Sequence, residues 1–559
     1  MSETQSEKLF VSDAAVRTYK LALPALILLT PFLVFLDYNS YCLACAETWI
    51  VLSGLIVLAM ACSVVMLLGG WIVSGLVMAV LITAFVDLQF APRNWTDWGD
   101  EWAAVLLFSG MQTLVLSLFL KEKFYTITAT IFLTFFVVTV FQLALPSRNN
   151  DSRFGHLEPA VHAPPRIIHL ILDEHIGIEG IPTDIEGGLA AKNLITRFYL
   201  KHGFQLSGGA FSRFYYTHNS LGNMLNFSVE SDSSALISGR GPFNLLRNKY
   251  FELLSERKYR IEVLTSGWVD LCSYSTVVIS RCITKNWRIL DNFANVDLPV
   301  FQKVQVLYSR YLNQSIIVAA IVYVLDAFKA RFPALASSMS QWRWALDPER
   351  TRTDSLNSLA DLKVVWSDIL SVPHGTVFFA HLSIPHYPYV ALSNCSIRPP
   401  NRDFLWHSRG LFDQPRTNTV VSRKERYKHY FEQLECLYLR LDELFDRMRA
   451  AGVYDDSIII FHGDHGSRIV MTDPISGNRH ALTKQDLVDG FSTLFAVKLP
   501  GRRGGYDKSL RPLEQLFAEF VFEAGLTPTR ILPEKSEPHV YLITDHDTDP
   551  IRILYTPPN

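Results

Sequence analysis

The sequence predicts an N-terminal bundle of five transmembrane helices followed by an α/β domain, whose mainly parallel sheet carries helices on both faces. Two observations lead to this prediction. Long apolar runs are confined to the N-terminal part, whereas short β-rich runs alternate with helical stretches in the remainder. We therefore expect a membrane domain over residues 1–145, a linker over 146–165 and an outer domain over 166–559.

Each apolar run is close to the ~20 residues that a helix needs to cross a bilayer. Five runs with almost no internal charge argue against buried helices of a soluble protein, and against a cleaved signal peptide. The runs are Leu21–Leu36, Trp49–Leu68, Trp71–Val86, Ala103–Leu120 and Phe124–Leu145. The composition agrees, because 49% hydrophobic residues is high for a wholly soluble protein.

Basic residues predict the orientation of these helices. Lys8, Arg17 and Lys20 precede the first run, and Lys121 and Lys123 lie between the fourth and the fifth, whereas acidic residues crowd the third loop. Because basic loops stay in the cytoplasm, five crossings place the C-terminal domain outside. We expect a multi-pass inner (plasma) membrane protein with a periplasmic or otherwise extracytoplasmic C-terminal domain.

Six of the seven cysteines would then face an oxidising compartment, where disulfides persist. Spacing does not fix their connectivity, and the Cys-x-x-Cys pair would also suit a metal or redox site. The pairs that we expect are Cys272 with Cys282, Cys395 with Cys436, and Cys42 with Cys45. A net charge of −2 does not indicate a polyanion-binding surface, so nucleic acid is not an expected partner.

The outer domain shows the α/β pattern. Short β-rich runs occupy Arg166–Leu172, Tyr259–Thr265, Thr376–Ile384, Ser457–Phe461 and Ser492–Leu499. Leucines at helical spacing predict a long helix over Arg423–Ala451, with Gly452 as its stop. Ligands collect at the carboxyl ends of strands in such sheets, which directs attention to the residues that follow the runs.

Carboxylates and an imidazole stand at two of these ends. Asp173 and Glu174 follow the first run, and Asp464 and His465 follow the fourth. Carboxylate oxygen together with imidazole nitrogen suits zinc or manganese better than calcium. A capped turn with a surface histidine is the alternative for the Asp-His step.

Thr217 is a third candidate. It could cap a short helix running through Met224 and Leu225, which would place its hydroxyl at the positive helix end, where phosphate or sulfate binds. A cap without further function is the alternative.

These motifs together resemble the alkaline-phosphatase superfamily, in its sulfatase-like branch of membrane phosphoethanolamine and phosphoglycerol transferases. The resemblance spans about residues 166–500. It implies an alkaline-phosphatase/sulfatase-like fold, an acidic metal ligand at Asp173, a nucleophile at Thr217 and a late metal pair at Asp464 and His465. It also matches the Thr-x-x-Ser step ending at Ser220.

A further match is His386 in a His-x-Pro motif after the third β-rich run. Two positions depart from the pattern: Ser467 and Arg468 follow Gly466 where glutamate is usual, and Gly222 replaces a common proline. These departures weaken the substrate assignment. Thr217 cannot become the formylglycine of sulfatases, which disfavours sulfate-ester hydrolysis by that route.

The expected chemistry needs a divalent metal, zinc or alternatively manganese. Held by Asp173, Asp464, His465 and the Thr217 hydroxyl, it would lower the hydroxyl's pKa, because an unassisted threonine is a poor nucleophile. Glu174 is expected to be a further ligand or to orient one. Attack would give a phospho-threonine intermediate, released to an acceptor hydroxyl or to water.

Other side chains are expected to handle the substrate. His386 and His480 could protonate the leaving alcohol or bind the phosphoryl group, and Arg468 and Ser220 are expected to contact substrate. Packing against neighbouring tyrosines is the alternative for His386. The apolar segment Ile316–Leu325 could lie at the membrane interface or form a lid, or be a buried core helix.

Three functions remain open. The first is a membrane transferase that moves phosphoethanolamine or phosphoglycerol from a phospholipid donor to an envelope glycan or lipid. The second is a membrane-anchored sulfatase-like hydrolase of phosphoric or sulfuric esters. The third is a non-catalytic envelope protein that binds metal or glycan.

Overall fold

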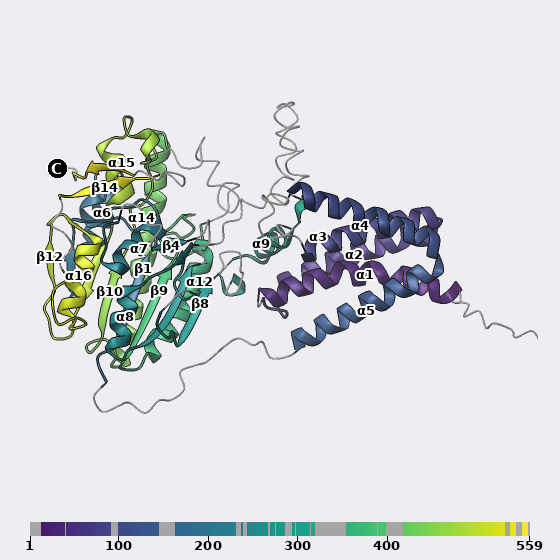
Figure 1. Ribbon diagram of the computed structural model, residues 1–559, viewed down its shortest axis with the longest axis horizontal. Helices are drawn as coiled ribbons and strands as arrows, with labels where there is room; N and C mark the ends of the chain where they lie inside the picture. Colours follow the sequence, from purple (N-terminus) through teal and green to yellow (C-terminus); the bar gives the residue numbers. More distant parts are fainter. Residues whose placement is uncertain are drawn as a thin grey trace, which may run out of the picture. The chain divides into compact units, whose positions relative to one another are not determined.

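The structure is a computed structural model of the whole chain (Figure 1). The residues that it describes are 13–39, 41–90, 99–144, 163–230, 236–238, 243–266, 269–273, 276–285, 293–296, 298–312, 315–318, 354–387, 389–398, 418–531, 537–543 and 550–556. Most of the predicted linker, 146–165, lies outside this part.

The chain forms two compact units. The first comprises residues 1–151 and 290–351, and the second comprises residues 152–289 and 352–559. The expected outer domain over 166–559 stays a prediction; in this division the described residues 293–296, 298–312 and 315–318 group with the membrane helices. No apolar run long enough to span a bilayer marks this insertion, so hydropathy alone assigned it to the outer domain.

The membrane unit contains the five expected helices. All five are long and apolar enough to cross a membrane. They are α1 (Asp13–Tyr38), α2 (Ala46–Leu68), α3 (Trp71–Phe90), α4 (Gly99–Leu120) and α5 (Glu122–Ala144). Many of their apolar side chains are exposed, as helices that face lipid require.

A buried carboxylate joins the inserted segment to these helices. Asp87, near the end of α3, is fully buried and accepts hydrogen bonds from Ser315 Oγ at 2.5 Å and from the backbone N–H groups of Ile316 and Ile317, both at 3.0 Å. The inserted helix α9 (Val300–Leu312) adds Tyr311, whose ring packs on Phe32 of α1 at 5.1 Å between centroids.

The start of the apolar segment at Ile316 therefore belongs to the membrane unit, as an Asp-capped helical turn. Residues 319–325 of that segment lie outside the described part. Sequence reasoning missed Asp87, although an acidic residue inside a membrane helix is itself a signal of an important contact.

Replacing Asp87 with leucine is expected to release the inserted segment. Four donors lose their acceptor, namely Ser315 Oγ, the N–H groups of Ile316 and Ile317, and Trp102 Nε1, at a cost of about 1–3 kcal/mol for each bond to a charged group. Hydrogen exchange of residues 315–318 in the detergent-solubilised protein should become faster, and the melting temperature should fall. Asp37→Leu, the same change at an exposed acid of α1, is the control; equal exchange in wild type and Asp87→Leu would contradict the anchoring role.

The second unit is built on an eight-stranded sheet with the order β12-β2-β11-β10-β1-β9-β6-β8. The central strands β10, β1, β9, β6 and β8 run parallel, whereas β11 is antiparallel to both of its neighbours. The strands are β1 (Ile167–Leu172), β2 (Gln205–Ser207), β6 (Arg260–Ser266), β8 (Arg281–Lys285), β9 (Thr376–Leu382), β10 (Ile458–His462), β11 (Phe495–Lys498) and β12 (Gly505–Asp507). The predicted mainly parallel α/β sheet is confirmed.

Helices cover both faces of this sheet. Alternate residues of β1 show the two faces: Ile168 and Leu170 enter one core, and Ile167 and Ile171 enter the other. The first core is covered by α6 (Gly188–Lys201), α12 (Asp354–Ser371) and α14 (Val420–Ala450), and the second by α7 (Thr217–Asn226), α8 (Lys249–Glu256) and α16 (Leu513–Glu523).

Shorter elements complete the second unit. They are helix α15 (Lys484–Phe491), the strand pairs β3 (Ala210–Phe211) with β13 (Arg511–Pro512) and β14 (His539–Leu542) with β15 (Ile551–Leu554), and a small sheet of β4 (Ile237–Ser238), β5 (Phe243–Leu245) and β7 (Val269–Asp270).

The long helix α14 begins and ends where local chemistry dictates. Thr419 caps its first turn by accepting from the Ser422 N–H, and the Ser422 hydroxyl accepts in return from the Thr419 N–H. Gly452 follows its last turn with φ of +69°, a conformation that favours glycine. The predicted stop is thus confirmed, whereas the start lies three residues before the predicted Arg423.

Disulfides join all three expected pairs, Cys42–Cys45, Cys272–Cys282 and Cys395–Cys436. The Cys-x-x-Cys pair is thus a disulfide in the first loop of the membrane unit. Cys62, in α2, stays free.

A buried histidine pair lies in the second core. Nε2 of His169 on β1 and Nε2 of His462 on β10 are 2.8 Å apart. Burial, and then the neighbouring His462, lower the pKa of His169 well below its ordinary value of 6.5. The folded protein therefore holds this ring neutral, whereas the unfolded chain protonates it in mild acid.

This pair should make stability depend on pH. Because the folded pKa of His169 is depressed, its contribution is fully present above about pH 6.5 and is lost as pH falls below that value. The free energy of unfolding should fall between pH 7 and pH 5, and His169→Met should reduce this fall. Chemical denaturation of the full chain in detergent measures both; an unchanged pH slope in the variant would contradict the assignment.

Candidate metal centre

Strand register brings the predicted motifs together. β1 pairs in parallel with β10, with Ile171 opposite His462, and with β9, with Leu172 opposite Leu382. The carboxyl ends of three adjacent strands therefore meet at one edge of the sheet. The residues that follow β1 and β10 are Asp173 and Asp464-His465, which accordingly become neighbours in space.

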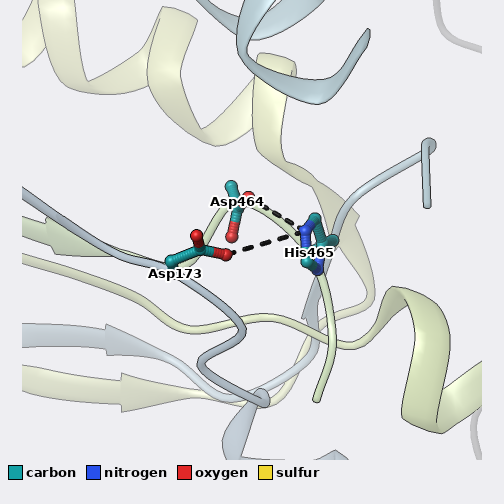
Figure 2. A group of neighbouring side chains, drawn as sticks. All are labelled: Asp173, Asp464 and His465. Carbon is teal, nitrogen blue, oxygen red and sulfur yellow. Dashed lines mark ion pairs between the residues drawn. The ribbon is translucent and has the colours of Figure 1, made fainter. Parts of the chain in front are cut away.

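Asp173, Asp464 and His465 form a compact buried group (Figure 2). One ligand atom from each lies within 4.8 Å of the others. Figure 2 shows both carboxylates directed at the imidazole, with His465 Nε2 lying 3.0 Å from Asp464 Oδ2 and 3.8 Å from Asp173 Oδ1. Among the described residues, this is the group of acids and histidines that could hold a metal ion.

The His465 ring is oriented for coordination. Its Nδ1 lies 3.0 Å from the Gly466 carbonyl oxygen, to which only a protonated nitrogen can donate. That bond assigns the proton to Nδ1 and leaves the Nε2 lone pair facing the two carboxylates. A backbone carbonyl that fixes the outer nitrogen in this way is typical of metal-bound histidines.

Thr217 completes the group from another element. It is the first residue of α7, and its Oγ1 lies 3.1 Å from His465 Nε2. The N-cap is Tyr216, without a side-chain capping bond. The predicted helix is therefore present, but Thr217 is not its cap, and its hydroxyl faces the acid–imidazole group instead.

The donor set fits a divalent cation. Asp173, Asp464, His465 and Thr217 are 2%, 0%, 0% and 9% exposed, and Asp464 Oδ2 is buried without a hydrogen bond among the described residues. Two buried carboxylates beside one neutral imidazole leave negative charge that a metal ion would compensate. Two carboxylates, one imidazole and one hydroxyl supply four ligands, the number that zinc prefers.

The local field already favours the ionised acid. Burial raises the pKa of Asp464. With both of its ring nitrogens protonated, His465, followed by His381 and the Thr217 hydroxyl, outweighs burial and lowers that pKa well below its usual range. A carboxylate ready to bind a cation is the result.

Glycines let the chain approach the site closely. A Cβ on Gly466 would overlap the backbone of Asp489, and one on Gly463 would lie 2.6 Å from the His175 carbonyl oxygen. The Asp-His step is thus held between two positions that admit no side chain. Close packing at these two glycines, together with strand β10, fixes the position of Asp464 and His465.

Glu174 lies beside the three-donor group rather than in it. Its backbone N–H donates to Asp464 Oδ1 at 3.1 Å, which orients that ligand. Its carboxylate lies 3.4 Å from His386 Nε2 and 3.8 Å from an Arg468 Nη1. Of the two roles expected for Glu174, the geometry matches the orienting role.

His386 and Arg468 therefore face the site across the Glu174 carboxylate. Arg468 also donates to the Tyr215 carbonyl oxygen, at 2.7 Å from Nη2, and its guanidinium lies over the Tyr215 ring at 4.9 Å. These contacts fix a positive charge near Thr217.

Two predicted residues take other positions. The Ser220 hydroxyl donates to the Asp464 carbonyl oxygen at 2.5 Å and accepts from Ser212 Oγ at 2.9 Å, so these protein contacts hold it, and its expected substrate contact stays a prediction. His480 is exposed and accepts from Arg479 Nε at 2.8 Å; in the described part of the chain, no contact joins it to the site. The expected catalytic role of His480 is therefore not supported.

Two histidines that carried no prediction lie at the site. His381 on β9 has its Nε2 3.7 Å from Asp173 Oδ2, and burial lowers its pKa to about 4. His218 stacks on Phe243 with centroids 3.7 Å apart; burial, then Arg468 and His465, lower its pKa to about 3. Their positions in the sequence could have indicated them, since His381 lies near the end of a β-rich run and His218 follows Thr217.

No protein-family model and no curated protein sequence matches the chain. Similar solved structures include the C-terminal periplasmic domain of EcEptC from Escherichia coli in complex with Zn, with 12% identity and a TM-score of 0.40 over 70% of this chain and 93% of that one. Another is the lipoteichoic acid synthase LtaP from Listeria monocytogenes, with 12% identity and a TM-score of 0.37 over 70% and 85%.

A protein in the alkaline phosphatase superfamily from Vibrio parahaemolyticus also matches, with 11% identity and a TM-score of 0.37 over 69% of this chain and 75% of that one. At this low sequence identity, the chemistry of the site has to be inferred from the residues of this chain.

Loss of one ligand should abolish tight metal binding. Asp464→Asn keeps the shape of the side chain but removes a charge, and the affinity for Zn²⁺ should fall by more than about a hundredfold. Calorimetric titration of the metal-stripped full chain with Zn²⁺ measures this. His480→Ala, at an exposed histidine, should bind like wild type; one tight zinc in Asp464→Asn would contradict the site.

Proposed function

We propose that this protein is a metal-dependent membrane transferase, which moves a phospho-alcohol from a phospholipid to an envelope glycan or lipid through a phospho-threonine at position 217. One observation carries the proposal: a buried threonine hydroxyl at a helix start lies 3.1 Å from the imidazole of an Asp–Asp–His group. Carboxylates and an imidazole that can hold a cation are the neighbours that activate a threonine hydroxyl as a nucleophile.

Asp173, Asp464 and His465 would hold the metal, for which we propose Zn²⁺, with Mn²⁺ as the alternative. When bound, the cation supplies positive charge that lowers the pKa of a neighbouring hydroxyl and polarises a phosphoryl oxygen. The chain orients the nucleophile, since Thr217 is the first residue of α7 and its Oγ1 faces the group. Thr217 opens α7, and the positive end of the helix dipole favours an anionic phosphoryl group there.

The proposed first step exchanges one ester for another. A bond forms between Thr217 Oγ and phosphorus while the bond from phosphorus to the lipid alcohol breaks, and the threonine proton is balanced by the proton that the departing alcohol gains. An acceptor hydroxyl then reverses this exchange and frees Thr217.

Two neighbouring side chains support this step. His386 Nε2 lies 3.4 Å from the Glu174 carboxylate, which directs that ring edge toward the site, so the ring can give a proton to the leaving oxygen. The Arg468 guanidinium, held by the Tyr215 carbonyl oxygen, can pair with a phosphoryl oxygen.

The membrane unit supports a lipid donor. Five candidate spans exceed what tethering needs, and they would hold a catalytic pocket at the level of the lipid headgroups. We propose that the site lies on the outer, periplasmic side, as the basic loops indicate.

The intact mass of the purified chain tests the intermediate. After exposure of the zinc-loaded protein to vesicles of phosphatidylethanolamine or phosphatidylglycerol, wild type should gain one headgroup mass, which names the transferred group. Thr217→Ala should gain none and should lose donor turnover by about a thousandfold or more.

Matched variants make this result specific. Thr217→Ser keeps a hydroxyl and should still be modified, and Thr276→Ala, at an exposed threonine, should behave like wild type. Turnover of donor with water alone would replace the transferase by a hydrolase. Full activity of Thr217→Ala would refute the phospho-threonine route.

A further inference from the structure

We propose that Gln433 of α14 is a positioning residue for this reaction, because its side-chain amide fixes the loop that carries His386. The inference rests on the proposed function, in which His386 acts at the phosphoryl group. It adds a residue that neither the motifs nor the metal group indicated.

The Gln433 amide makes four hydrogen bonds, all to the backbone of one loop. Its Oε1 accepts from the N–H groups of Val390 at 2.7 Å and Ala391 at 3.3 Å. Its Nε2 donates to the carbonyl oxygens of Pro385 at 3.0 Å and His386 at 3.2 Å. The side chain is fully buried, and these bonds use both donors and both acceptor sites of the amide.

The loop depends on such contacts for its position. It follows β9, and its described residues from Ser383 to Val390 belong to no helix or strand. Other residues of α14 hold it as well: the Arg426 guanidinium lies 5.6 Å from the Tyr387 ring centroid, and Cys436 forms a disulfide with Cys395. Positions 426, 433 and 436 share one helix face.

The same helix also holds the partner of His386. Tyr430 donates its hydroxyl proton to the Glu174 carbonyl oxygen at 2.8 Å and accepts from the Ile176 N–H at 2.9 Å. Tyr430 and Gln433 are three residues apart on one rigid element. α14 therefore sets the separation of Glu174 and His386, whose carboxylate and ring lie 3.4 Å apart.

The chemistry of the amide makes the proposal testable. Gln433→Glu keeps the shape but loses both N–H donors and places a carboxylate against two carbonyl oxygens. For donor turnover by the zinc-loaded full chain, kcat should fall on the order of tenfold to a hundredfold while KM changes little, since the loop shifts but the metal group stays. Gln205→Glu, the same change at an exposed residue, should leave kcat unchanged.

A double-mutant cycle distinguishes positioning from general stabilisation. If Gln433 acts through His386, Gln433→Glu should change kcat by less than about twofold in a His386→Ala background. Effects that multiply in the double variant would overturn the proposal. Should Gln433→Glu fail to fold, Gln433→Met, which removes the four bonds and keeps an apolar chain of similar length, replaces it in the same cycle.

Failure of the proposed function gives a different result. If wild type turns over no phospholipid, hydrogen exchange at the Val390 and Ala391 amides still tests the role of Gln433. Faster exchange in Gln433→Glu, with an unchanged melting temperature, supports the positioning role, and unchanged exchange refutes it.

Discussion

The concentration of negative charge at one edge of the central sheet is the constraint on which the second unit depends. Asp173 and Asp464 are buried beside a single imidazole, and taking carboxylates out of water costs several kcal/mol each unless positive charge compensates them. The surrounding features serve this arrangement: the Gly466 carbonyl fixes the ring, the Glu174 N–H binds Asp464, and close packing at Gly463 holds the turn. A charge cluster of this kind could hold a metal ion.

Much of this architecture could be predicted because the determining signals are local. Five long apolar runs, short apolar runs in buried strands such as Ile167–Leu172 and a 3.6-residue period in α14 each follow from side-chain burial on a regular backbone. The Asp173–Asp464–His465 group could also be predicted from the sequence, since Asp173 and the Asp464-His465 step come just after strands. Parallel neighbours end at the same edge, so proximity followed from position alone.

Contacts that join residues distant in sequence could not be predicted. Ser220 was expected to bind substrate, but its hydroxyl is occupied by Ser212 and the Asp464 carbonyl oxygen, two partners that no spacing reveals. The polar face of α14 was overlooked because leucines dominate its periodicity, although Gln433 is as buried as they are. Asp87 was missed because three of its hydrogen-bond partners, Ser315, Ile316 and Ile317, lie more than two hundred residues further along the chain.

The grouping of residues 290–351 with the membrane helices has a consequence for any attempt to cut the protein in two. The polypeptide passes between the units three times, near residues 151, 290 and 351, so neither unit is one contiguous stretch of chain. A fragment starting at residue 166 would carry α9 without the aromatic partners Phe32 and Phe35 and without Asp87. Such a fragment therefore keeps part of the membrane unit, α9, without its packing partners. The apolar surface of this helix would be exposed to water and prone to self-association.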